Sequence, residues 1–311
     1  MNSLHRKVSA SGQGWFSVAA VLIGIAFVFS SALLSHAQAL GWEGETGVFV
    51  TPLAYTASAE GQKIHAVTAY HYFNAGPVIG DFHEASIEVG IGKRLEFGYT
   101  HEFHLFGSQM GTPAEPGLST LWQNGLEIFN GKFRLVPENY AKTKWVPAIS
   151  AGFMVRENVR NVGNLSGQNM YGMTGKSNGD IYMVATKVVP TKPVALVLSG
   201  GVRGTNAELW GMGGNAPDWQ ARAFGAVAFA FSGPYKSSII FGSEASQQPH
   251  HPLNFPTLNI PTTLTYCVRF VPSPKHKLNF DFGIAQIAGN VLPGVDLKAR
   301  HQAGFQVSYG F

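Results

Sequence analysis

The last eleven residues, 301–311, read His-Gln-Ala-Gly-Phe-Gln-Val-Ser-Tyr-Gly-Phe and alternate strictly between two kinds of side chain. One face carries Phe305, Val307, Tyr309 and Phe311, and the other carries glycine, glutamine and serine. A period of two is typical of a β-strand that lies between two environments. Large apolar groups on one side and small polar groups on the other suit a strand whose outer face meets lipid and whose inner face meets a lumen. This stretch therefore predicts a transmembrane β-barrel.

Similar alternating segments, separated by turn residues, recur along the chain from residue 62 onward. The predicted strands lie at about 62–73, 81–91, 95–105, 125–136, 145–156, 180–189, 194–203, 220–231, 237–246, 264–270, 278–284 and 301–311. The connections between them alternate between short and longer ones, as do the periplasmic turns and external loops of bacterial outer-membrane barrels. We therefore predict an all-β fold, an antiparallel up-and-down barrel of about twelve strands with both termini in the periplasm.

Two segments resemble known outer-membrane proteins. The terminal strand, with Phe305, Val307, Tyr309 and Phe311, resembles the C-terminal insertion signal of Gram-negative outer-membrane barrels. This resemblance implies recognition by the barrel-assembly machinery and a final location among the lipids of the outer membrane. Residues 47–54, Gly-Val-Phe-Val-Thr-Pro-Leu-Ala, loosely resemble a motif that opens some exopolysaccharide-export outer-membrane barrels. The alternative for these eight residues is a plain extended lead-in.

The N-terminus has the features of a secretory signal. Arg6 and Lys7 precede an uncharged, mostly apolar run at 15–34, and Ala37-Gln38-Ala39 offers an A-x-A cleavage site. The alternative is an uncleaved anchor, since such a run is long enough to span a bilayer. We predict a cleaved signal peptide at 1–39, a periplasmic lead-in at 40–61 that lies mostly outside the barrel, and a barrel at 62–311.

The composition argues against several classes of function. Charged residues make up 13% of the 311 residues, the formal net charge is only +4, and Cys267 is the single cysteine. A small and scattered positive charge does not favour nucleic acid. One cysteine cannot form an internal disulfide, and no cysteine and histidine residues have zinc-site spacing. We expect no metal, no cofactor and no nucleic-acid partner.

The charged residues of the predicted strands mostly fall on the inward face, where they avoid a cost of about 2–4 kcal/mol for a base at the bilayer midplane. The candidate lumen-lining residues are Glu84, Glu88, Arg94, Glu96, Glu102, Lys132, Arg134, Arg156, Arg222, Glu244, Arg269, Lys277, Asp281 and Arg300. If they line water, acids on one wall and bases on others make a transverse field across a pore. If they meet each other, they are ion pairs that fill a closed barrel. Sequence leaves both interpretations open.

The sequence favours a channel for passive or gated passage of small polar solutes. The alternative is an accessory barrel in envelope or exopolysaccharide export, or a structural outer-membrane protein. A barrel-borne hydrolase using His250 or His251 is the third class, but no catalytic motif supports an enzyme. A hydrated lumen would favour the channel, and a filled lumen with an ordered segment 40–61 would favour the accessory barrel. A cluster of serine, histidine and acid at the rim would favour the hydrolase.

Overall fold

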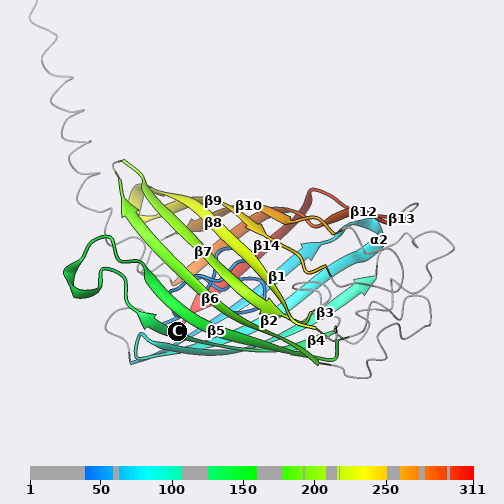
Figure 1. Ribbon diagram of the computed structural model, residues 1–311. Helices are drawn as coiled ribbons and strands as arrows, with labels where there is room; N and C mark the ends of the chain where they lie inside the picture. The colour runs from blue at the N-terminus through cyan, green and yellow to red at the C-terminus, as the bar shows by residue number, and fades with distance from the viewer. Residues whose placement is uncertain are drawn as a thin grey trace, which may run out of the picture.

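The protein is a closed antiparallel β-barrel of twelve strands, drawn on its side in Figure 1. The computed structural model describes residues 39–58, 63–106, 125–159, 177–191, 193–207, 216, 218–250, 260–272, 277–292 and 295–311. Residues 1–38 of the predicted signal peptide, with Ala37 of the predicted cleavage site, lie outside these residues. The predicted fold class is confirmed.

The barrel strands follow one another around the cylinder in chain order. They are β1 (Ile64–Asn74), β2 (Gly80–Ile91), β3 (Leu95–Phe106), β4 (Leu126–Val136), β5 (Ala148–Glu157), β6 (Ser177–Pro190), β7 (Ala195–Thr205), β8 (Gln220–Ser232), β9 (Ser238–Ser246), β10 (Thr263–Val271), β11 (Leu278–Gln286) and β14 (Gln302–Gly310). The barrel closes where β1 pairs with both β2 and β14, so that Tyr70 lies opposite Ala85 on one side and Val307 on the other. Every barrel strand therefore has two hydrogen-bonded neighbours, and the barrel has no open edge.

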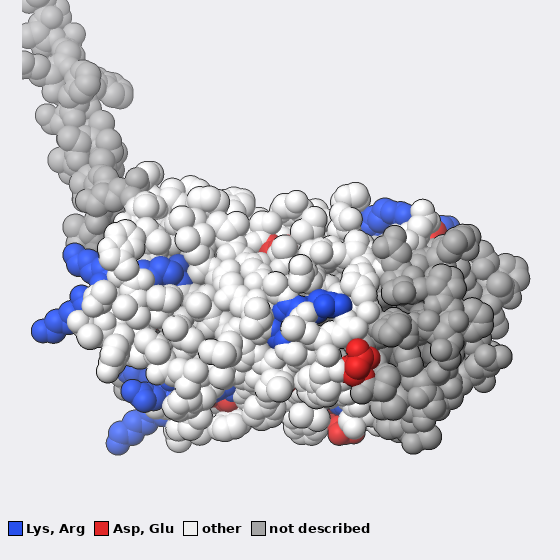
Figure 2. Space-filling view, in the orientation of Figure 1, with Lys and Arg blue, Asp and Glu red and all other residues white. Residues whose placement is uncertain are grey.

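The two faces of each strand differ as the alternation predicts. On β11, Phe282 is 63% exposed whereas its neighbour Asp281 is 2% exposed, because one points out of the barrel and the other into it. The visible outer wall in Figure 2 is mostly free of charged groups between its ends. A continuous apolar exterior of this extent is what a barrel needs to sit in lipid. Among the described residues, no helix has the length and apolar character to cross a membrane.

The two ends of the barrel differ. Short turns and the C-terminus lie at one end, here called the turn end, and the longer connections lie at the other, the loop end (Figure 1). The loop end carries two elements that the sequence did not predict, the short helix α2 (Gly76–Ile79) and a hairpin of β12 (Ala288–Leu292) and β13 (Val295–Ala299).

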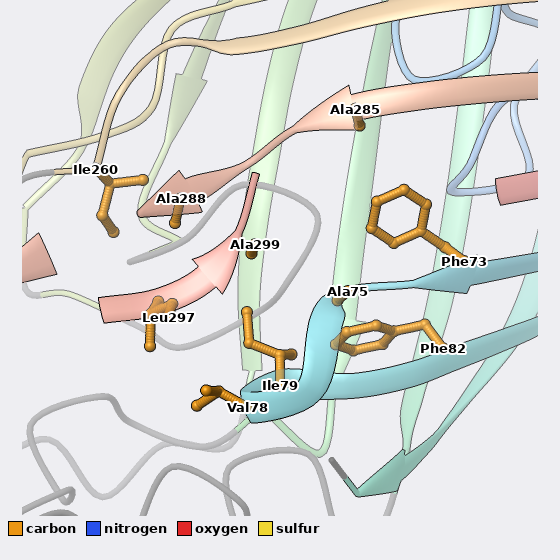
Figure 3. Packing of buried hydrophobic residues seen from close by; sticks show 10 residues of the cluster. All are labelled: Phe73, Ala75, Val78, Ile79, Phe82, Ile260, Ala285, Ala288, Leu297 and Ala299. Carbon is orange, nitrogen blue, oxygen red and sulfur yellow. The ribbon is translucent and has the colours of Figure 1, made fainter. Parts of the chain in front are cut away.

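These two elements make an apolar cluster over the loop end, which Figure 3 shows from close by. Val78 and Ile79 of α2 pack with Leu297 and Ala299 of β13, and Phe73 and Phe82 join them from β1 and β2. Burying these side chains between α2, the hairpin and the barrel wall removes apolar surface from water and holds the elements in place. The loop end is thus covered on the side of β1, β2 and β11.

Candidate functional site: a lumen occupied by the chain's own N-terminal segment

Nine of the fourteen predicted lumen-lining residues are buried inside the barrel. They are Glu84, Glu88, Glu96, Glu102, Lys132, Arg156, Glu244, Arg269 and Asp281. Each of these residues lies on the face of its strand opposite to the apolar outer face. Because that apolar face points outward, the charged side chains point into the lumen.

Five predicted residues do not lie deep in the lumen. Arg94 and Lys277 are exposed in turns at the turn end, and Arg134 and Arg222 are only half-buried. Arg300 follows the β12–β13 hairpin, where its guanidinium donates to the Asp296 carboxylate at 2.8 Å. Placing Arg300 in the lumen was wrong, because the chain turns at His301 (φ +56°) and β14 begins only at Gln302.

Residues 39–58 are folded inside the barrel, and we call them the lumen segment. Ala39, Leu40 and Ala57 have almost no exposed surface, and the Gln306 side chain of β14 donates to the Leu40 carbonyl. Figure 1 draws this segment in blue between the strands of the cylinder. The expectation that residues 40–61 lie mostly outside the barrel is wrong for 40–58. The physical reason is that lumen side chains satisfy the segment's backbone groups.

The first such contact is a clamp on the tight turn at 47–52. The backbone N–H groups of Phe49, Val50 and Thr51 donate to the Glu244 carboxylate at 2.9–3.2 Å, and the Thr51 hydroxyl donates to it at 2.7 Å. On the other side, Arg269 donates to the Val48 carbonyl at 2.6 Å while it also bonds to Asp281 at 2.7 and 3.0 Å. The eight residues compared above with an export motif thus include the turn that β9 and β10 hold.

A second contact joins the middle of the segment and its C-terminal end to the opposite wall. Glu96 of β3 accepts from the Thr46 N–H at 3.1 Å, the Thr46 hydroxyl at 2.7 Å and the Ala57 N–H at 2.8 Å. The Lys132 ammonium lies 2.6 Å from Glu96 and donates to the Thr46 carbonyl at 3.0 Å. Hydrogen bonds to charged partners are stronger than neutral ones, so this pair is a strong anchor.

A third contact is an ion-pair network that includes residues the sequence analysis missed. Arg156 pairs with Glu43 of the lumen segment and with Asp180 of β6 at 2.9 Å, and Arg203 of β7 pairs with Asp180 at 3.1 Å. Asp180 escaped detection because β6 carries apolar residues on both faces. Arg203 lies on β7, where the alternation with Val202 was a usable signal for its inward position. Tyr182 is one of the inward apolar residues of β6, and it packs in a cluster with Ala54 of the lumen segment.

The apolar side chains of the lumen segment occupy gaps left by small residues in the wall. A Cβ added to Gly283 would lie 2.9 Å from the Phe49 ring, and one added to Gly304 would lie 3.2 Å from it. Phe49 and Val48 also pack with Cys267 of β10. Glycines on the inner faces of β11 and β14 thus give a large side chain of the lumen segment room to dock.

The tip of the lumen segment is acidic and meets an acidic wall. Gly44 (φ +92°) sits so close to β3 that an added Cβ would lie 2.1 Å from the Thr100 hydroxyl. It is flanked by Glu43 and Glu45, while the wall at this height carries Glu84 and Glu102, which pair directly across β2 and β3. Among the described residues, neither carboxylate oxygen of Glu45 has a hydrogen-bond partner. Burial, followed by the nearby Glu43 carboxylate, raises the pKa of Glu45 from 4.5 to about 8.

In this arrangement the lumen segment fills the interior of the barrel. Within the described ranges, no group of three or more histidine, cysteine, aspartate or glutamate residues has the geometry to hold a metal ion. His250 lies at the loop end with its N–H donating to Gln220 at 2.9 Å, and His251 lies outside the described residues. The ordered segment in a filled lumen meets the criterion given above for the accessory or structural barrel.

A family model described as "Protein of unknown function (DUF3034)" matches residues 38–271. No curated protein matches the chain. Solved structures with a similar shape include the KdgM porin, with TM-score 0.41 and 9% identity over 79% of this chain and 99% of that one. The COG4313 outer membrane channel from Pseudomonas putida F1 is similar with TM-score 0.41 and 12% identity over 84% of this chain and 97% of that one.

Proposed function

The chain belongs to the DUF3034 family of proteins of unknown function, and we propose that it is a gated outer-membrane channel whose lumen is closed by its own residues 39–58. The proposal includes the location of the protein in the outer membrane of a Gram-negative-type bacterium. The closed barrel and its apolar exterior support a membrane location.

The observation that carries the proposal is the polar character of the contact between the segment and the wall. Glu96, Lys132, Glu244 and Arg269 all bind backbone groups of the segment, and these four side chains belong to the barrel itself. When the segment leaves, water can solvate the same side chains, so the wall is suited to a hydrated state as well as to the closed one. If the wall that contacts the segment were purely apolar, water could not solvate it well after the segment leaves, and the hydrated state would not be stable.

The charges of the wall also predict a preference for cations. The buried acids contributed by the described barrel strands are Glu84, Glu88, Glu96, Glu102, Asp180, Glu244 and Asp281. The buried lysine and arginine residues there are Lys132, Arg156, Arg203 and Arg269. An excess of carboxylates around a water-filled constriction attracts cations and repels anions. Small cationic or zwitterionic solutes are therefore the proposed permeants.

The test is a disulfide that locks the segment in place. An ideal Cβ on Gly242 would lie 2.9 Å from the Cys267 sulfur and 3.5 Å from a Val48 methyl carbon, so these two side chains adjoin. Val48→Cys then places a second thiol beside the native one, and Val48→Ser is the matched control without a crosslink. We expect discrete, cation-preferring conductance steps in planar bilayers from the wild type, none from oxidised Val48→Cys, and their return with a reductant.

The second candidate is a structural or accessory barrel, which the filled lumen and the apolar cluster over the loop end favour. Trp42 of the lumen segment packs against this cluster, so the segment contributes to both closures. Conductance that persists in the fully crosslinked variant would contradict gating by the segment. Silence from wild type, reduced variant and control alike would favour the structural barrel.

A further inference from the structure

The turn end of the barrel is strongly basic. The five short connections at 92–94, 137–147, 191–194, 233–237 and 272–277 contain eight lysine or arginine residues and one acid, Glu138. The described bases among them are Lys93, Arg94, Lys142, Lys144, Lys236 and Lys277. Figure 2 shows several blue groups at this end of the molecule, on the left of the view. The chain's formal charge of +4 hides this concentration, because it is a sum over the whole sequence.

The backbone of these turns shows that lysine is present for its side chain. The N–H groups of Arg94, Thr143 and Ser237 each donate to the carbonyl three residues earlier, which closes three tight turns. The third residue of each turn is a lysine with positive φ, at +63°, +62° and +66° for Lys93, Lys142 and Lys236. Turns of this primed type favour glycine or asparagine at such positions, and other residues are strained there. Lysine in three of them points to a role for the charge.

The acid in these turns does not neutralise the bases beside it in the sequence. Glu138 accepts from the Tyr55 hydroxyl at 2.9 Å, from Lys187 at 3.0 Å and from the Val188 N–H at 2.8 Å. All three partners lie on the lumen segment or on β6. Lys142 and Lys144 lie in the same turn as Glu138, but Glu138 pairs with Lys187 instead. Among the described residues, no carboxylate forms an ion pair with Lys142 or Lys144. The β4–β5 turn therefore presents two exposed positive charges.

Exposed aromatic rings lie in the same turns. Trp145 is 79% exposed directly after Lys144, and Tyr235 is 95% exposed directly before Lys236. Tryptophan and tyrosine gather at the boundary between hydrocarbon and headgroups, because one part of each ring system is apolar and another forms hydrogen bonds. A lysine next to such a ring lies at the depth of the lipid phosphates.

We propose that the turn end binds the anionic headgroups of phospholipids in the leaflet that surrounds it, with Lys142, Lys144 and Trp145 as one binding point. This inference rests on the membrane location proposed above but not on gating. The ammonium groups bind phosphate, and the indole sits at the level of the glycerol backbone. The attraction of a lysine to an anionic membrane surface corresponds to about fivefold in association per residue.

The test uses spin-labelled lipids in membranes that contain the full mature chain. Electron paramagnetic resonance measures the association of phosphatidylglycerol at the barrel relative to phosphatidylcholine. We expect a preference of about twofold or more for phosphatidylglycerol at low salt, and its loss in 1 M NaCl, where the screening length is about 3 Å. Lys142→Gln/Lys144→Gln should reduce this preference. Lys298→Gln/Arg300→Gln, which removes the same charge at the loop end, should leave it unchanged.

Each other outcome overturns the assignment. Equal association of the two lipids in the wild type, or equal losses in both double variants, would show that the turn lysines do not select anionic headgroups. Retention of immobilised heparin by the wild type but not by Lys142→Gln/Lys144→Gln, with no lipid preference, would assign the surface to a soluble polyanion instead. Failure of the chain to enter bilayers would contradict the membrane location itself. This outcome is distinct from a chain that enters bilayers but shows no preference for anionic lipid.

Discussion

Glu96→Gln tests how the lumen segment is held. Glu96 accepts hydrogen bonds from both Thr46 and Ala57 of the segment, and its carboxylate lies 2.6 Å from the Lys132 ammonium. Both side chains of this pair are fully buried. Glutamine keeps the shape of the side chain but removes its charge, so the substitution leaves the buried Lys132 ammonium without its ion-pair partner.

The magnitude follows from the burial of the pair. Removing one partner of a buried ion pair costs about 3–5 kcal/mol, because the other charge stays buried and uncompensated. Water reaches Lys132 once the segment has left, so the penalty falls on the closed state. With about 1.4 kcal/mol for each factor of ten, the fraction of molecules with a released segment should rise by about 10²-fold to about 4 × 10³-fold.

The single cysteine reports this release. Cys267 is 8% exposed and packs under Val48 and Phe49, on β10, whereas Glu96 lies on β3. Its rate of modification by a water-soluble maleimide in detergent micelles should rise in proportion to the released fraction. Glu127→Gln is the matched control, since Glu127 lies on the outer face of β4 beside His101 and Tyr99. An unchanged rate in folded Glu96→Gln barrels, or an equal rise in the control, would refute the reasoning.

Three further predictions concern pH, packing and assembly. In the closed state the pKa of Glu45 is raised from its usual 4.5 to about 8. The closed state therefore binds the Glu45 proton more tightly than a chain in which this carboxyl has its usual pKa. Closure should weaken as pH rises from about 4.5 to about 8, by about 5 kcal/mol in all. The ratio of Cys267 modification rates in wild type and Glu45→Gln at each pH cancels the ionisation of the thiol, and a flat ratio would contradict this. Phe49→Ala empties the space beside Gly283 and Gly304 and should weaken closure by about 3–5 kcal/mol, seen as a higher open probability in planar bilayers. Phe311→Ala should lower the yield of heat-modifiable, folded barrel in outer membranes, since the resemblance of the terminal strand to an insertion signal assigns this residue a role in assembly; an unchanged yield would argue against that role.

The strands were predictable because lipid and lumen impose opposite requirements on neighbouring residues. A charge placed on the lipid face is costly, so Asp281 and Phe282 could be assigned to opposite sides without knowledge of their contacts. The boundaries of most strands differ from prediction by only a few residues for the same reason. Where both faces are apolar, as on β6, the rule gives no answer, and Asp180 was missed.

The lumen segment could not be predicted because its order comes from contacts distant in sequence. Gln306 lies 266 residues from Leu40, to which it donates, and Glu244 lies 193 residues from Thr51. The segment has no periodicity of its own, since most of its backbone groups bond to side chains of the wall or to its own turns instead of to a neighbouring strand. The inward-facing Tyr182 and Val184 were a usable signal, because apolar groups in a polar lumen require a partner to cover them.

In the proposed gated channel, the two interpretations of the lumen charges describe two states of one molecule. In the closed state, Lys132 and Arg269 each bind both a wall carboxylate and a carbonyl of the lumen segment. Departure of the segment leaves these wall ion pairs in place and opens their remaining donors to water. The Glu43 carboxylate then moves away from Glu84 and Glu102. This relieves the repulsion between Glu43 and these two acids, which opposes closure. The same side chains that hold the segment thus become the lining of the proposed pore, and the acidic tip supplies a force that favours opening.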